Sequence, residues 1–346
     1  MSKMKVALMS EIGKIEIVER DIPVPKDDEV LVKVKHCGVC GSDVHYFEKG
    51  RIGNFIVTKP IVLGHECAGE VVQVGKNVKS HKLGELVALE PGIPCGRCEF
   101  CKRGLYNLCP DVVFLATPPY DGAFCGYISY PADMAFKLPE GMDTLEGALI
   151  EPLSVGFHAA MQAEAKVGQS AVVLGAGCIG LCTMLALKSM GVNTIYMVDV
   201  IDTRLNMAKK IGALDAFNSK DIDIVKKIIE MTGGIGVDMV FETAGATATT
   251  QMTPALVKRG GTIVLVGMAP DSVMSYDLGA VLAKEARIHT VFRYRNIYRL
   301  AINAVSGNAI PLREIVTSIF PFDKVEDAFK YNIKNRANTI KVVVQM

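Results

Sequence analysis

The sequence predicts an α/β protein that combines a mostly β domain with a doubly wound parallel sheet. Apolar and polar positions alternate through residues 1–35 and again at 70–75, which is typical of antiparallel strands. After about Gly168, strand patterns alternate with helical patterns, which indicates parallel strands joined by right-handed crossovers. With 346 residues, half of them hydrophobic, the chain can form two domains with sizeable cores.

The parallel part of the chain begins with a short apolar strand and ends where the alternation stops. Its expected strands are residues 171–174, 194–199, 237–241, 261–266 and 287–292. An amphipathic helix follows the second of these strands and ends near Gly212. Residues 339–344 form one more expected strand, which returns to the first domain. We therefore predict a first domain made of 1–152 and 293–346, and a second domain made of 153–292.

Charge and hydropathy argue against nucleic acid and membrane as partners. The formal net charge is +1 and no basic block occurs, whereas a nucleic-acid partner would normally leave a basic stripe. The longest uncharged run, 171–187, contains three glycines and fits a buried strand, turn and helix better than a membrane span. Ten cysteines without a secretion signal indicate a reducing compartment, and we expect the cytoplasm.

Four cysteines occur close together with the spacing C-x2-C-x2-C-x7-C. They are Cys95, Cys98, Cys101 and Cys109. Four thiolates from one short loop form a closed tetrahedral zinc site with a structural role. An iron–sulfur cluster and four unliganded thiols are the alternatives to this interpretation.

A second group combines a thiolate, an imidazole and a carboxylate. Cys40 lies in the first glycine-framed motif, and His65 and Glu66 lie in the second. This is the ligand set of a catalytic zinc that keeps one position open. Cys37 is a competing ligand because it forms a C-x2-C pair with Cys40, but no second such pair lies nearby to complete a zinc knuckle. We expect Cys37 in the core.

The glycine pattern Gly175-x-Gly177-x-x-Gly180 follows an expected strand and opens an expected helix. Glycines at these positions allow a tight turn and close approach of a pyrophosphate, and the helix N-terminus supplies N–H donors. Asp199, at the end of the next strand, would bind the ribose hydroxyls and repel a 2′-phosphate. No arginine directly follows it. The sequence therefore predicts a dinucleotide site that prefers NAD to NADP.

These motifs together resemble those of the zinc-dependent medium-chain alcohol dehydrogenases. The stretches that carry the resemblance are Cys37-Gly-Val-Cys-Gly-Ser-Asp-Val-His-Tyr46, the pattern Gly-His-Glu-x2-Gly-x5-Gly-x2-Val at 64–78, and the four-cysteine loop. The resemblance implies a GroES-like catalytic domain that is split around a Rossmann domain, two zinc ions per chain and a homotetramer.

The resemblance also implies roles for residues around the catalytic zinc. Cys40 and His65 match the first two ligands, and the third is Glu66 or the glutamate of Glu151-Pro-Leu. Because a second carboxylate would weaken the zinc as a Lewis acid, we expect only one glutamate to bind at a time. Ser42 would accept the substrate proton, and His45 would relay it, unless His45 is a surface histidine. Asp43 would orient His65.

Further cofactor contacts follow from the same resemblance. They are Ile179, Arg204, Val266, Gly267, Met268, Val291, Phe292 and Arg293. For Arg204, a solvated position on a helix face is the alternative.

The stretch Phe292-Arg-Tyr-Arg-Asn296, together with Tyr46 and Phe114, resembles the sorbitol (polyol) dehydrogenases, of the L-iditol 2-dehydrogenase type. The implied substrate residues are Tyr46, Phe114, Glu151, Arg293 and Tyr294. The expected reaction is oxidation of a secondary hydroxyl of an acyclic polyol to the ketose, and sorbitol, xylitol and L-arabinitol are all open. The four-cysteine loop departs from many animal sorbitol dehydrogenases, which lack it. Alternatives are a related dehydrogenase acting on 2,3-butanediol, L-threonine or a sugar-alcohol phosphate, and a non-catalytic zinc-binding protein.

Overall fold

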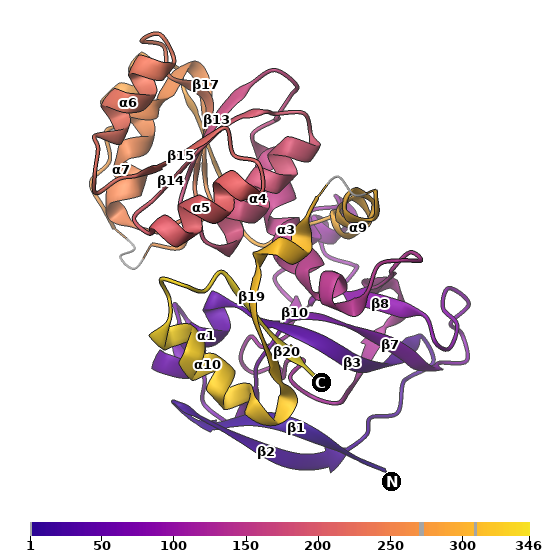
Figure 1. Cartoon of the computed structure of the whole chain (residues 1–346). Helices are drawn as coiled ribbons and strands as arrows, with labels where there is room; N and C mark the ends of the chain where they lie inside the picture. The colour runs from indigo at the N-terminus through magenta and orange to yellow at the C-terminus, as the bar shows by residue number, and fades with distance from the viewer. Residues whose placement is uncertain (1, 270–272, 308–309) are drawn as a thin grey trace. The chain divides into compact units, whose positions relative to one another are not determined.

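The computed structural model describes residues 2–269, 273–307 and 310–346 (Figure 1). The chain divides into two compact units. The first unit comprises Met1–Glu151, Tyr298–Ser306 and Val316–Met346, and the second comprises Pro152–Ile297 and Gly307–Ile315. Relative to the predicted domain ranges, 152, 293–297 and 307–315 lie in the second unit.

The first unit is mostly β. Its strands are β1 (Lys3–Glu11), β2 (Lys14–Asp21), β3 (Glu29–Val39), β4 (Arg51–Ile52), β5 (Phe55–Ile56), β6 (Ile61–Val62), β7 (Glu66–Val74), β8 (Leu86–Leu89), β9 (Gly92–Ile93), β10 (Val113–Phe114), β11 (Tyr127–Pro131), β12 (Ala135–Lys137), β19 (Val316–Pro321) and β20 (Lys341–Gln345). Its helices are α1 (Gly41–Lys49), α2 (Glu99–Lys102), α9 (Tyr298–Ser306), α10 (Val325–Lys334) and the start of α3 (Thr144–Gln162), with short 3-10 turns between strands.

The largest sheet of this unit joins the beginning and the end of the chain. Its strand order is β12-β8-β7-β3-β20-β19, and β11 also pairs with β3. β3 pairs with β7 on one side and with β20 on the other, both antiparallel. The alternating apolar residues of these strands form one hydrophobic core. The last strand therefore returns to the first part of the chain, as expected.

The second unit is a parallel sheet with helices. Its elements are β13 (Ser170–Leu174), α4 (Cys178–Ser189), β14 (Thr194–Asp199), α5 (Asp202–Lys210), β15 (Asp215–Asn218), α6 (Ile224–Met231), β16 (Val237–Glu242), α7 (Thr247–Leu256), β17 (Val257–Leu265), α8 (Leu278–Ala283), β18 (Arg287–Thr290) and a 3-10 turn, Leu312–Ile315.

The six strands of this sheet run in the order β15-β14-β13-β16-β17-β18, all parallel. Counted along the chain this is 3-2-1-4-5-6, the doubly wound order, with its switch point between the first and fourth strands. Figure 1 shows α4 and α5 on one side of the sheet and α6 and α7 on the other. The expected α/β fold is confirmed. The short strand β15 was not predicted.

The structure also bears on the apolar run at 171–187. It forms β13, a glycine turn and most of α4, and all of its residues except 177–179 are buried in the second unit. None of the helices within the described residues has the length and hydropathy that a membrane span requires.

Candidate functional site

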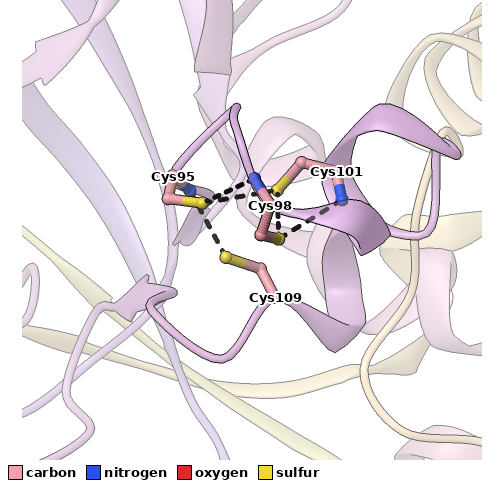
Figure 2. A group of neighbouring side chains, drawn as sticks. All are labelled: Cys95, Cys98, Cys101 and Cys109. Carbon is pink, nitrogen blue, oxygen red and sulfur yellow. Dashed lines mark hydrogen bonds between the residues drawn. The ribbon is translucent and has the colours of Figure 1, made fainter.

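The four cysteines at 95–109 point toward one another (Figure 2). β9 and β10 pair with each other and close the base of the loop that carries them. Their sulfur atoms all lie within 4.8 Å of one another, with 3.4 Å between Cys98 and Cys101 and 3.9 Å between Cys95 and Cys101. In a tetrahedral zinc site with bonds of about 2.3 Å, neighbouring sulfurs lie about 3.8 Å apart. The spacing fits one metal ion, whereas a cluster of several irons would hold the sulfurs further apart.

Backbone N–H groups surround these sulfurs. The N–H groups of Cys95, Cys98 and Cys101 donate to the sulfurs of Cys109, Cys95 and Cys98. Hydrogen bonds from the backbone of Arg97 and Cys98 lower the pKa of the Cys95 thiol to about 6. Donors of this kind stabilise thiolate, the form that binds metal.

The second candidate metal site lies where β3 ends and the neighbouring strand β7 begins. β3 and β7 pair so that Gly38 lies opposite Glu66, which brings Cys40 beside His65 and Glu66. One ligand atom from each of these three residues lies within 4.8 Å of the other two. A thiolate, an imidazole and a carboxylate at this spacing fit zinc with a fourth position open. Among the described residues, Cys37 does not belong to this group and is fully buried, as expected.

Asp43 ties the two segments together from the first turn of α1. Its carboxylate accepts hydrogen bonds of 3.0 Å from the N–H groups of Cys40 and Gly64. It also lies 3.5 Å from Nδ1 of His65, which leaves Nε2 of that ring for a metal. Burial lowers the pKa of His65, but the negative charges of Asp43 and Cys40 outweigh this effect and raise it well above its ordinary value. A carboxylate behind a ligating histidine fixes the ring orientation.

One residue of this site was missed from the sequence. Lys341, the first residue of β20, donates to both carboxylate oxygens of Glu66 at 2.7 Å. Both side chains are almost fully buried. The available signal was a single lysine at the start of an otherwise apolar strand, Lys341-Val-Val-Val.

Glu151 is buried in α3, but it is not among the donors that gather around Cys40. Burial raises the pKa of nearby Glu90 to about 7. The hydroxyl of Tyr106, which donates to Glu90, opposes this rise, and the negative charge of Glu151 adds a smaller contribution to it. Of the two glutamates predicted as the third ligand, Glu66 is therefore the one that lies beside Cys40 and His65. Glu151 as a ligand stays a prediction.

The remaining predicted residues of the first unit lie on α1 and β10. Ser42 is partly exposed, and His45 is exposed on α1. Tyr46 is buried in the core. The ring of Phe114 lies 5.7 Å from that of His65, measured between centroids, so Phe114 forms part of the surroundings of the metal ligands.

In the second unit, the three glycines form the turn between β13 and α4. Gly175 has φ +101°, a conformation that favours glycine. A Cβ atom on Gly180 would lie 1.8 Å from the carbonyl oxygen of Gly175, so only glycine fits there. A Cβ atom on Gly177 would meet nothing closer than Arg204 Nη1 at 3.8 Å. The side of the turn at Gly177 is therefore open to a ligand.

Asp199 lies beside this turn at the end of β14. Its carboxylate accepts hydrogen bonds of 2.7 Å from the N–H groups of Ala176 and Val200. Arg204 Nη1 lies 4.0 Å from the same carboxylate. A carboxylate has about four acceptor positions, so Asp199 can bind ribose hydroxyls while it holds the turn.

The other predicted cofactor residues follow the carboxyl ends of neighbouring parallel strands. Val266, Gly267 and Met268 follow β17, and Val291, Phe292 and Arg293 follow β18. Leu174, Glu242, Leu265 and Thr290 lie in one row across the sheet, which places these loops along one edge. Ligands of doubly wound sheets bind at this edge.

Two of the predicted substrate residues, Arg293 and Tyr294, also lie in the second unit. Arg293 has φ +57°, a left-handed conformation that is uncommon for residues other than glycine. Its guanidinium lies 4.9 Å from the centroid of the Phe292 ring. Tyr294 is buried. Uncommon backbone conformations of this kind gather at functional sites.

Each of the two units contains a segment that matches a known protein family. Residues 26–140 match the alcohol dehydrogenase GroES-like domain family, and residues 178–307 match the zinc-binding dehydrogenase family. A sorbitol dehydrogenase of Bacillus subtilis is 41% identical, over 99% of this chain and 97% of that protein.

Two solved structures are also similar over nearly the whole chain. An Escherichia coli oxidoreductase/dehydrogenase of unknown specificity is 44% identical, with a TM-score of 0.96 and 99% of both chains covered. A zinc-binding dehydrogenase of Sinorhizobium meliloti bound to NADP is 31% identical, with a TM-score of 0.92 and both chains fully covered. The chain therefore belongs to the zinc-dependent medium-chain alcohol dehydrogenases, a family of oxidoreductases, and the sorbitol dehydrogenases are among its near relatives.

Proposed function

We propose that this protein oxidises a secondary hydroxyl of an acyclic polyol to the ketose, with a catalytic zinc ion and NAD. The observation that carries the proposal is the group formed by Cys40, His65 and Glu66, a donor set that holds zinc and leaves one position for substrate. Zinc bound there would supply a Lewis acid that lowers the pKa of the substrate hydroxyl, and NAD would accept the hydride.

The residues around this position orient the metal ligands and transfer the proton of the substrate hydroxyl. Asp43 fixes the ring of His65, and Phe114 excludes water beside it. Ser42, two residues after Cys40, accepts the proton of the substrate hydroxyl, and exposed His45 on the same helix passes it to solvent. Only one of the two carboxylates, Glu66 or Glu151, would bind the metal at a time.

The substrate class is supported by the relative named sorbitol dehydrogenase and by polar residues suited to several hydroxyl groups. Tyr46, Glu151, Arg293 and Tyr294 would bind the neighbouring hydroxyls, and Phe114 would shape the wall. A site that binds several hydroxyls rejects analogues that lack them by large factors, because its polar groups would be left unpaired.

The test is the initial rate of NADH formation with sorbitol, xylitol, L-arabinitol, 2,3-butanediol, L-threonine and a sugar-alcohol phosphate, with and without a zinc chelator. We expect a polyol to be oxidised fastest and the chelator to abolish the activity. Activity on butanediol, threonine or the phosphate alone would identify a different substrate class. Activity that survives complete removal of zinc would overturn the mechanism.

The choice of NAD rests on Asp199, whose carboxylate would repel a 2′-phosphate. A relative that is 31% identical binds NADP, so the cofactor needs its own test. We expect NAD to be preferred by the ratio of kcat/KM, and Asp199→Gly to weaken NAD much more than NADP. Loss of one charge-assisted hydrogen bond, worth about 1.5–3 kcal/mol, corresponds to roughly 10- to 150-fold in NAD affinity.

The metal content and the assembly are part of the same proposal. We expect two zinc ions per chain, the second held by the four cysteines in a structural role. We also propose a cytoplasmic homotetramer. β18 is an edge strand of its sheet, and exposed apolar residues lie near it, among them Ile288 and Leu282, which fits association between copies. Metal analysis and light scattering test these two points.

A further inference from the structure

The carboxylate of Glu66 is held by Lys341, a residue near the end of the chain. Lys341 Nζ donates to both of its oxygens at 2.7 Å and to the carbonyl oxygen of Val39 at 3.3 Å. Glu66 is 1% exposed and Lys341 is 3% exposed. Among the residues that the structure describes, only Lys341 donates hydrogen bonds to this carboxylate. Its position therefore depends on Lys341.

Strand β3 lies between the strands that carry Glu66 and Lys341, and a glycine in β3 leaves space for the two side chains to come into contact. Glu66 begins β7 and Lys341 begins β20, and β3 runs between these strands. Gly38 of β3 lies opposite Glu66, and a Cβ atom on Gly38 would lie 1.9 Å from Oε2 of that carboxylate. The carboxylate thus crosses β3 over a residue without a side chain. Gly38, the residue that leaves this space, lies two residues before the proposed ligand Cys40.

A stabilising role alone is a weak reason for such an ion pair. Removing two charges from water carries a large desolvation cost, and well-packed apolar residues often stabilise a fold equally well or better. Here the pair lies against a group that already contains the thiolate of Cys40 and, behind His65, the carboxylate of Asp43. A positive charge in this position offsets the negative charges around the metal.

We propose that Lys341 is a positioning residue for the catalytic metal. It holds the Glu66 carboxylate in the orientation that the metal needs and offsets its negative charge. The inference rests on the proposed zinc site. Partners of ligating side chains change metal affinity or activity by about 10- to 100-fold when they are removed. Without Lys341, the Glu66 carboxylate has no fixed orientation and binds zinc more weakly.

The test is the rate at which the zinc-loaded enzyme releases metal to a chromogenic chelator. The four-cysteine site serves as an internal reference in the same sample. We expect Lys341→Met to release the catalytic zinc about 10- to 100-fold faster while the reference site is unchanged. Lys341→Arg keeps the charge and two donors and should stay within a few-fold of wild type. Gly38→Ala, which pushes the carboxylate aside with both charges intact, should also accelerate release.

A double variant covers the case in which Lys341→Met does not fold. Glu66→Gln/Lys341→Met removes both buried charges together and should release zinc at the rate of Glu66→Gln alone, because Lys341 acts through Glu66. Release at the wild-type rate in Lys341→Met, or a further acceleration in the double variant over Glu66→Gln, overturns the inference. A wild-type protein that binds zinc only at the four cysteines would overturn the proposed function instead.

Discussion

The chemistry proposed for the first unit depends on side chains that long-range strand pairing brings together, whereas that proposed for the second unit depends mainly on backbone. Cys40, His65 and Lys341 come from segments that meet only because β3 pairs with both β7 and β20. In the second unit, the turn of Gly175 and the loops after β17 and β18 lie along one sheet edge because the strands are parallel. Such loops need only the right strand order and small residues at fixed places.

The two kinds of site should therefore respond differently to substitution. The proposed ligand Cys40 is only partly buried and can be replaced with little effect on packing, so we expect its loss to appear in activity and metal content. A glycine of the second unit occupies a place that backbone atoms define, so its replacement affects folding at one position and ligand binding at another.

The largest expected effect is that of Cys40→Ser. Lewis-acid stabilisation is worth several kcal/mol, so kcat should fall by roughly 10³-fold when the catalytic zinc is lost. Binding of NAD, followed by fluorescence titration, should be unchanged, and the zinc content should fall from two ions per chain to one.

Cys37→Ala is the matched control for this variant, three residues earlier in the same motif. Cys37 is fully buried and outside the metal group, so we expect a modest loss of stability with both zinc ions retained. Retained activity in Cys40→Ser, or loss of zinc in Cys37→Ala, would contradict the assignment.

The glycine turn of the second unit offers a pair of variants with opposite results. Gly180→Ala would place a methyl group 1.8 Å from a backbone oxygen, and overpacking of this kind costs about 1–3 kcal/mol of unfolding free energy. Gly177→Ala meets no such obstacle, because the nearest atom lies 3.8 Å away and its φ is −74°. Its added methyl should instead hinder the pyrophosphate and cost at least one charged hydrogen bond, or roughly tenfold in NAD affinity.

Urea unfolding and NAD titration of both variants separate these effects. We expect the midpoint of unfolding to fall for Gly180→Ala and to stay at the wild-type value for Gly177→Ala. A Gly177→Ala protein that binds NAD normally would show that the pyrophosphate does not approach this side of the turn.

The difference between local motifs and long-range contacts explains which parts of the fold and the site could be predicted from the sequence. The four cysteines and the three glycines each lie within 15 residues of chain, so spacing alone indicated their arrangement. Lys341 is separated from Glu66 by 275 residues, and no local pattern connects them. Strand β15 is short, with one buried residue, and left no alternation to recognise. Arg293 was expected in the first domain with the residues after it, but 293–297 lies in the second unit, where Arg295 contacts His158 of α3.

The last prediction concerns pH and tests whether a buried side chain outside both sites matters to the second unit. Burial, with a smaller contribution from the charge of Arg295, lowers the pKa of His158 to about 4. Since the unfolded chain protonates histidine near pH 6.5, the folded state is favoured above that pH, and the advantage is lost as pH falls toward 4. At pH 5 this corresponds to about 2 kcal/mol relative to pH 7.5.

His158→Gln removes the titrating group and keeps a polar side chain of similar length. Urea unfolding at pH 7.5 and pH 5 should show a smaller loss of stability on acidification in this variant than in wild type, by about 2 kcal/mol. The stability of the variant at pH 7.5 serves as its own reference, so any packing defect cancels from the comparison. Equal losses in the two proteins would mean that His158 becomes protonated without unfolding. In that case Arg295 and the packing of α3 would have to accommodate a second positive charge, and the second unit would tolerate buried charge in the way that the first unit does at Lys341.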